Sequence, residues 1–168
     1  MTLPLQKPVR VLITGGTFDK VHNWKEENLD FLDSHGTQVP RALEEGRCFF
    51  PVVETLFQMD SLDMTDDHRA VLATHIENAG EDAIVVTHGT GTMEHTAKYL
   101  AGKNLAKTVV LTGAMRPHSL YISDAGFNLG GAIIAAQTLS LGVYGVMNGR
   151  VFEAKDLQKN TEAGRFDI

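Results

Sequence analysis

The sequence contains a single cysteine, Cys48, among 168 residues. One thiol cannot form an internal disulfide, and it excludes a zinc site built from several cysteines. The first ten residues lack the apolar core of a secretory signal peptide. Because disulfides belong to oxidising compartments, the scarcity of cysteine fits a protein of the reducing cytoplasm, which is where we expect this chain.

Positive charge is also scarce. Lys and Arg together number 15, against 21 Asp and Glu, and the formal net charge is −6. Nucleic-acid binding depends on clustered cations, and the sequence has no basic block, so we expect no nucleic-acid partner. No apolar run approaches the roughly 18–20 residues that a membrane-spanning helix needs, so we expect no membrane association either.

What the chain does contain is ordinary for one globular domain: 43% hydrophobic and 21% charged residues. Segments of β-branched residues alternate with segments of helical periodicity. This order predicts an α/β fold with a mainly parallel sheet flanked by helices, a Rossmann- or flavodoxin-like three-layer sandwich. We expect strands at 9–13, 48–56, 83–86, 108–111 and 143–147, and helices at 65–79 (closed by Gly80), 93–101 and about 124–139 (capped by Ser123 and Asp124). Residues 18–46 are polar and irregular in pattern, and the remainder, 148–168, is polar and short.

Ligands of such folds bind beyond the carboxyl ends of the strands. Three loops in that position are rich in small polar residues, at 14–17, 87–92 and 112–117. A fourth segment, 60–63, precedes a helix and is expected to join them. The convergence of these loops predicts a small-molecule site at one edge of the sheet.

Two common kinds of site are disfavoured by the motifs. The glycines of the 14–17 and 87–92 loops complete neither a dinucleotide-binding pattern nor a phosphate-binding loop. The seven histidines form no H-E-x-x-H motif, so we expect no metal site.

Hydroxyl chemistry remains open. Thr17 and Thr90 each follow a strand and stand beside glycines that allow close backbone approach to a ligand. A threonine becomes a nucleophile only when a base takes its proton. The alternative is that both hydroxyls merely satisfy hydrogen bonds of the turns.

The chain resembles the bacterial-type L-asparaginases in Thr14-Gly15-Gly16-Thr17, in His88-Gly89-Thr90-x-Thr92-Met93-Glu94 and in Gly113-Ala114-Met115-Arg116-Pro117. The resemblance covers nearly the whole sequence. It implies hydrolysis of an amino-acid side-chain amide, L-asparagine to L-aspartate and ammonia, by a threonine nucleophile and without a cofactor.

The resemblance also implies roles for individual residues. Thr17 matches the nucleophile, Thr90 the second catalytic threonine, and Lys159 the lysine that activates this second threonine. Ser61 matches the serine that binds the substrate α-carboxylate. Without the resemblance, Lys159 would be interpreted as a solvated residue of the tail. The substrate-binding residues expected on this basis are Gly16, Ser61, Gly89, Gly91 and Ala114.

The chain departs from the family pattern in three respects. Gly91 occupies the position of an aspartate that holds the substrate α-ammonium. The segment 18–46 lacks the tyrosine that the family places beside the nucleophile. We expect residues 1–168 to form a single N-terminal-type domain, without the C-terminal domain of the family.

These departures leave three hypotheses open: an asparaginase, active or weakened by Gly91; a catalytically inactive ligand-binding relative; or an amidase for a substrate that lacks the α-ammonium group. In full-length relatives a neighbouring subunit's C-terminal domain helps to close each site. We therefore expect a homo-oligomer.

Overall fold

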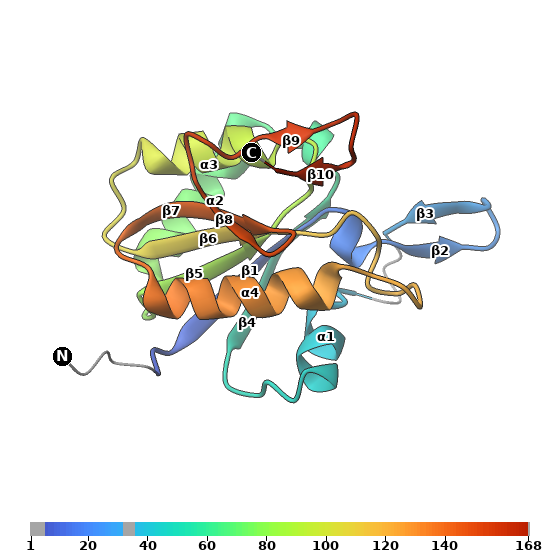
Figure 1. The fold of residues 1–168 in the computed structure, drawn as a ribbon, viewed down its shortest axis with the longest axis horizontal. Coiled ribbons are helices and arrows are strands. Elements are labelled where there is room, and N and C mark those ends of the chain that lie inside the picture. Colours follow the sequence, from blue (N-terminus) through green and yellow to red (C-terminus); the bar gives the residue numbers. More distant parts are fainter. Residues whose placement is uncertain (1–5, 32–35, 168) are drawn as a thin grey trace.

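A six-stranded sheet with the strand order β4-β1-β5-β6-β7-β8 forms the centre of the molecule (Figure 1). The structure is a computed structural model and describes residues 6–31 and 36–167. The first five strands of this order are parallel, and β8 runs antiparallel to β7. Along the chain the elements are β1 (Val9–Gly15), η1 (Thr17–Asp19), β2 (Val21–Asn23), β3 (Asn28–Asp30), α1 (Val39–Glu45), β4 (Val52–Met59), η2 (Ser61–Asp63), α2 (Asp66–Asn78), β5 (Ala83–Thr87), α3 (Met93–Ala101), β6 (Thr108–Thr112), α4 (Ala125–Thr138), β7 (Gly142–Met147), β8 (Arg150–Glu153), β9 (Lys159–Asn160) and β10 (Arg165–Phe166).

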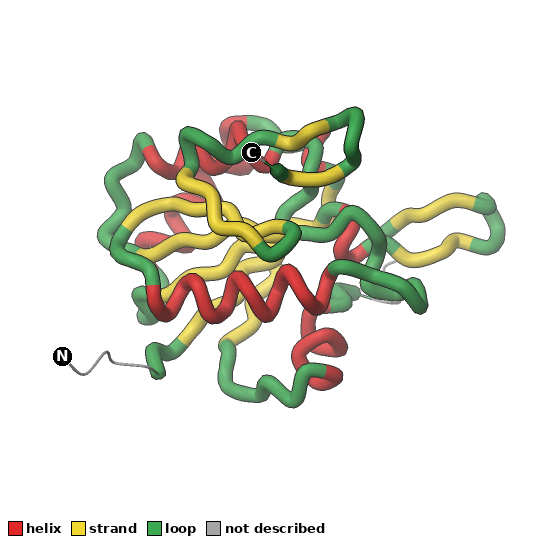
Figure 2. Tube along the Cα trace, viewed as in Figure 1, coloured by secondary structure: helices red, strands yellow, loops and turns green. Residues whose placement is uncertain are grey.

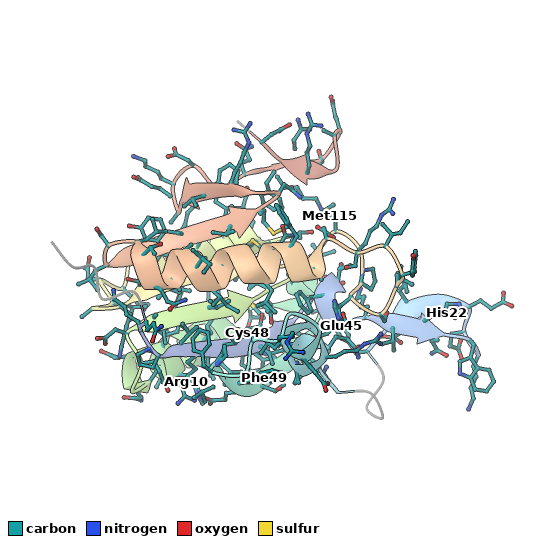
Figure 3. All side chains as sticks on the ribbon, turned by 60° about the horizontal axis from the view of Figure 1, so that its bottom comes forward. Arg10, His22, Glu45, Cys48, Phe49 and Met115 are labelled. Atoms are coloured by element: carbon teal, nitrogen blue, oxygen red, sulfur yellow. The ribbon has the colours of Figure 1, made fainter. Side chains whose placement is uncertain are left out.

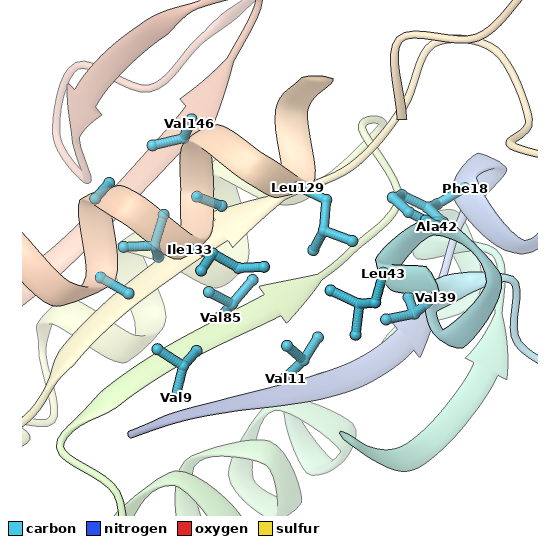
Figure 4. Close-up of a cluster of buried hydrophobic side chains, with 14 of the residues drawn as sticks. Val9, Val11, Phe18, Val39, Ala42, Leu43, Val85, Leu129, Ile133 and Val146 are labelled. Atoms are coloured by element: carbon cyan, nitrogen blue, oxygen red, sulfur yellow. The ribbon is translucent and has the colours of Figure 1, made fainter. Parts of the chain in front are cut away.

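Alternating side chains of the strands build a separate core on each face of the sheet. Val9 and Val11 of β1 join Leu43 of α1 and Ile133 of α4 in one cluster (Figure 4). Leu12, between them in the sequence, belongs to the second cluster with residues of α2 and α3. Two helices therefore cover each face, and the predicted three-layer α/β class is confirmed.

The order of the parallel strands places a switch point between β1 and β5. The connection from β1 leads through α1 to β4 at the sheet edge, whereas β5 continues through α3 to β6 in the other direction. In open α/β sheets, ligands bind at this point, outside the carboxyl ends of the two strands. Thr17 follows β1 and Thr90 follows β5, so the topology directs both threonines to the same crevice.

The prediction that residues 18–46 are irregular is wrong. Most of the described part of this segment is ordered as η1, a β2–β3 hairpin and α1; residues 32–35 lie outside the described part. The hairpin projects from the body of the molecule (Figures 1 and 2), and Figure 3 labels His22 on it. Trp24, next to the hairpin turn, is 74% exposed. The polar composition of this segment reflects exposure rather than absence of structure.

The tail is also more ordered than its composition suggested. β8 extends the sheet, and β9 pairs with β10 in a small two-stranded sheet. Leu157 and Phe166 are buried, and the Phe166 ring lies 6.4 Å from that of Phe152. These buried apolar side chains help to anchor a segment that is otherwise polar.

Several boundaries differ from the prediction. β4 begins at Val52, because Pro51 has no N–H for the ladder and the Cys48 N–H donates instead to Leu43 O after α1. Helix α2 ends at Asn78 with Ala79 as its cap, so Gly80 lies beyond it. No helix in the described part of the chain is long and apolar enough to cross a bilayer.

Candidate active site

The loops after β1, β4 and β5 touch one another at the switch point. Gly16 has φ of +80°, and a Cβ placed on it would collide with the backbone of Gly89. A Cβ on Gly89 would in turn lie 2.6 Å from Ser61 Oγ. Glycine at both positions is therefore what allows the three loops to approach so closely. The predicted residues Gly16, Ser61 and Gly89 form one contiguous surface.

Lys159 reaches this surface from the far end of the chain. Its Nζ donates a hydrogen bond of 3.0 Å to Thr90 Oγ1, although the two residues are 69 positions apart. Thr90 is buried, and Lys159 belongs to β9, which lies beside the sheet rather than in it. Among the described residues no carboxylate forms a salt bridge with Lys159. The amine is therefore directed at a threonine hydroxyl, and the interpretation of Lys159 as a solvated residue is wrong.

Thr17 lies in a more open environment. It begins η1, directly after Gly16, and is only partly buried. Its hydroxyl has no hydrogen-bond partner within the described part of the chain. Lys20, just after η1, forms a 2.8 Å salt bridge with Asp60, directly before Ser61. Contact with the Lys20 ammonium holds the pKa of Asp60 below its usual range. This ion pair ties the Thr17 segment to the Ser61 segment.

Ser61 is buried and held on both sides by Thr92. The Thr92 N–H donates to Ser61 Oγ at 3.3 Å, and the Thr92 hydroxyl donates to Ser61 O at 2.8 Å. With its oxygen accepting from a backbone amide, the Ser61 hydroxyl keeps its own proton for a ligand. A carboxylate is a suitable acceptor for such a donor.

A buried polar relay supports the loop that carries Thr90. His88 Nδ1 lies 2.7 Å from Gly89 O. A carbonyl oxygen can only accept a hydrogen bond, so Nδ1 carries the proton. Nε2 then accepts from the Thr96 hydroxyl at 2.8 Å, and Thr96 Oγ1 accepts from Arg69 Nε at 2.9 Å. Burial, with a smaller contribution from the Arg69 charge, lowers the pKa of His88 to about 4. His88 is therefore neutral at physiological pH and acts in this arrangement as a fixed hydrogen-bonding link.

Ala114 is buried in the loop after β6, which approaches the same area. A Cβ on the preceding Gly113 would collide with His88 O. The loop continues into Met115 and Arg116, whose N–H groups both donate to the Asp124 carboxylate. Asp124 thus holds this loop instead of capping α4 with its side chain, as its sequence position had suggested.

Gly91 has neighbours on the side where a larger side chain would extend. A Cβ there would lie 3.2 Å from both Leu62 Cδ2 and Ser61 Oγ, which is tight but involves the end of a flexible side chain. Leu62 is 75% exposed and can move. The described atoms nearest to this position therefore belong to an apolar side chain and a hydroxyl, not to a carboxylate.

Three residues around the site were not predicted from the sequence, namely Arg69, Thr96 and Lys20, whereas Asp60 and Leu62 were expected only as members of the 60–63 segment. Arg69 and Thr96 face each other from α2 and α3, and no motif connects them. The one usable signal was proximity in sequence, because Asp60 and Leu62 flank Ser61. The described residues contain no group of three or more His, Cys, Asp or Glu that could hold a metal ion.

Comparison with known proteins adds the decisive observation. Residues 8–167 match the family described as "Asparaginase, N-terminal". The chain belongs to the asparaginase family. L-asparaginase 2 of Escherichia coli K12 is 38% identical over 112 residues, which are 63% of this chain and 32% of that protein.

Other members of the family differ in what their names say they act on. The 60 kDa lysophospholipase of Homo sapiens is 33% identical over 147 residues, covering 80% of this chain and 26% of that protein. The crystal structure of L-asparaginase I from Vibrio cholerae superposes with a TM-score of 0.80 at 26% identity, over 96% of this chain and 51% of that one. The chain thus spans about a quarter to a third of the length of these curated relatives, and family membership alone does not fix the substrate.

Proposed function

We propose that this chain is an amidohydrolase that converts L-asparagine to L-aspartate and ammonia. The single observation that carries the proposal is the 3.0 Å hydrogen bond between Lys159 Nζ and Thr90 Oγ1. A lysine that meets a buried threonine at the switch point of an α/β sheet provides a base beside a hydroxyl, the pair that hydroxyl activation requires.

The reaction divides into two steps. The Thr17 oxygen attacks the amide carbon, its proton passes through the Thr90 hydroxyl and the Lys159 amine to the leaving nitrogen, and ammonia departs. Water then attacks the resulting ester, releases the acid and returns the proton to Thr17 Oγ. The partly exposed position of Thr17 admits both substrate and water.

The substrate is oriented by groups that remain available around the reacting centre. The Ser61 hydroxyl donates to the α-carboxylate. The backbones of Gly16 and Gly89 provide the surface against which the substrate lies, and the loop that carries Ala114 is proposed as a further part of the binding site. No cofactor enters this scheme.

Ammonia release from L-asparagine by the wild-type chain and by Thr17→Ala tests the proposal. We expect wild-type activity above background and its loss in the variant. Thr74→Ala is a matched control, because this exposed threonine lies on α2 and donates only to its own helix at Ala70 O. Equal rates from wild type and Thr17→Ala would contradict the proposal.

A second function is favoured by the surroundings of Gly91. Leu62 and Ser61 border this position, and neither offers a charge to a substrate ammonium. An amidase for a deaminated or acylated amide would not need that charge. A thermal-shift screen of asparagine, aspartate, glutamine and succinamate separates the two, because preferential stabilisation by succinamate favours the second function. An inactive ligand-binding protein would bind without releasing ammonia.

We also propose that the chain acts as a homo-oligomer. In support, the β2–β3 hairpin exposes Trp24 and follows directly after the Thr17 segment, where a second copy can cover it. Size exclusion with light scattering should give a mass above the 18.4 kDa of one chain. A mass of one chain at working concentration would remove this proposal.

A further inference from the structure

A chain of hydrogen bonds through Asn128 and Asn148 connects the loop after β6 with the tail of the protein. Asn128 Nδ2 donates to Gly113 O at 2.9 Å, and Asn128 Oδ1 accepts from the Asn148 N–H at 3.0 Å. Asn148 Oδ1 in turn accepts from the Phe166 N–H at 2.9 Å. Asn128 is bonded through both ends of its amide, which fixes its orientation. Asn148 donates with its backbone and accepts with its side chain, so it bridges the two segments.

The end of this chain of bonds lies directly opposite Lys159. In the β9–β10 pair, Phe166 is the ladder partner of Lys159, and Arg165 is the partner of Asn160. A bond that fixes the Phe166 backbone therefore fixes the strand on which the Lys159 side chain begins. From there, Lys159 Nζ reaches Thr90 Oγ1.

The two-stranded sheet needs such an anchor. Each of its strands has only two residues, and a two-stranded sheet is marginally stable on its own. Its turn is exposed, and its attachments to the body are the buried Phe166 ring, the Asn148 contact and the Lys159 contact itself. The buried Phe166 ring fixes how deeply the two-stranded sheet inserts into the body of the protein. A hydrogen bond is directional, so the Asn148 contact fixes the register of the backbone.

We propose that Asn148 is a positioning residue that holds Lys159 against Thr90 through the Phe166 backbone. The proposal rests on the amidohydrolase function for its kinetic consequence, but not for its structural one. Asn148 has φ of +53°, a conformation that asparagine tolerates and glycine adopts freely, so the side chain can be removed without straining the backbone.

The test compares Asn148→Gly, which removes the acceptor, with Asn148→Asp, which keeps an acceptor oxygen. Asn104→Gly is the matched control, because Asn104 is also an asparagine with positive φ but is exposed and remote from this chain of bonds. Thermal melting first establishes that each variant is folded. The activity-independent readout is labelling of Lys159 by an amine reagent, measured by peptide mass spectrometry relative to the exposed Lys155.

In Asn148→Gly, we expect the labelling of Lys159 to accelerate about tenfold. We also expect kcat to fall about tenfold to a hundredfold while KM changes by less than about threefold, because a small misplacement of a reacting group is costly. Asn148→Asp and Asn104→Gly should keep a labelling rate and a kcat close to those of the wild type. In a Lys159→Met background, Asn148→Gly should reduce kcat no further, which a merely structural role would not predict.

Folded Asn148→Gly with wild-type labelling would overturn the proposal. If that variant does not fold, amide exchange in the wild type decides, since the Phe166 N–H should exchange at least about a hundredfold more slowly than that of the exposed Glu162. Equal exchange would overturn the proposal. If the wild type releases no ammonia from any amide, the proposed function fails, while labelling and exchange still decide the role of Asn148.

Discussion

The two threonine loops of this site are built differently. The loop that carries Thr90 follows a strand whose residues are all buried, and it is supported by the His88–Thr96–Arg69 relay and contacted by Lys159. The loop that carries Thr17 continues into an exposed hairpin, and the charge behind it is the buried Asp19 carboxylate.

This difference separates proton handling from substrate access. The Thr90 side is enclosed and its groups are already hydrogen-bonded, so it can hold a base and a hydroxyl in fixed geometry. The Thr17 side is open, as a nucleophile that must meet substrate and then water requires. Substitutions on each side can test whether proton transfer belongs to the Thr90 side and substrate access to the Thr17 side.

The largest effect is expected from Lys159→Met. This change keeps the length of the side chain but removes the amine that contacts Thr90 Oγ1. Positioned acid–base groups contribute about 10²- to 10⁴-fold, so kcat for ammonia release should fall within that range. The free energy of unfolding should change little, because the contact lies on a partly exposed strand.

Lys155→Met is the matched control for this prediction. Lys155 lies four residues earlier, is exposed and pairs only with the exposed Glu153. It should leave kcat unchanged. A Lys159→Met variant that retained wild-type kcat would mean that the Thr90 side does not transfer the proton. That result would contradict the proposed separation of roles between the two loops.

The next prediction concerns the relay behind Thr90. The pKa of His88 is lowered by burial to about 4, against an ordinary value of 6.5. Between these values the unfolded chain binds a proton that the folded protein excludes, so the free energy of unfolding falls as the pH falls. From pH 7 to pH 4, His88 alone should account for about 3 kcal/mol.

His88→Gln isolates this contribution. Glutamine can donate to Gly89 O and accept from Thr96, but it does not titrate. Urea unfolding at pH 7 and pH 4 should show a smaller loss of stability in the variant than in the wild type, by about 3 kcal/mol. Equal losses would mean that His88 is not the buried neutral link that the hydrogen bonds indicate.

The fold was largely predictable because its signals are local. The apolar runs that became β5 and β6 and the capped segment of α2 stand out in the sequence, and their positions were predicted to within a few residues. The hairpin β2–β3 was missed because nearly all its residues are exposed, so it lacks the apolar alternation by which strands are predicted.

The site was predictable only where residues belong to motifs. Thr17, Ser61 and Thr90 stand in recognisable segments, and the structure places their loops together. Arg69 and Asn148 lie far from these segments in sequence, and what connects them to the site is a hydrogen bond across the folded molecule. Such contacts depend on tertiary packing, which no local pattern encodes.

A smaller effect is expected from Gly91→Asp. The new Cβ would lie 3.2 Å from Leu62 Cδ2, so Leu62→Ala is combined with it to provide room. A charge-assisted contact contributes about 1.5–3 kcal/mol, so KM for asparagine should fall by about one to two decades. KM for succinamate, which lacks the ammonium, should not fall. A parallel decrease for both substrates would show that the gain does not come from pairing with the ammonium.

The smallest effect is expected from Asp19→Asn, on the Thr17 side. Asp19 Oδ1 accepts from the Thr37 hydroxyl and the Gln38 N–H, both at 2.9 Å, and Oδ2 has no partner in hydrogen-bonding geometry among the described residues. Burial raises the pKa of this carboxyl above its ordinary value. The folded protein therefore binds the proton before the unfolded chain does, and the stability associated with Asp19 is lost as the pH rises through the folded pKa.

Asparagine keeps the accepting oxygen for both bonds and removes the buried charge. Asp19→Asn should therefore raise the free energy of unfolding at pH 7.5 by about 1 kcal/mol, and the gain should shrink as the pH falls and the wild-type carboxyl becomes protonated. His88 and Asp19 then respond to acid in opposite directions, one in each loop. A gain that grows toward low pH would mean that the Asp19 charge stabilises the Thr17 side, because its two hydrogen bonds would then outweigh its burial.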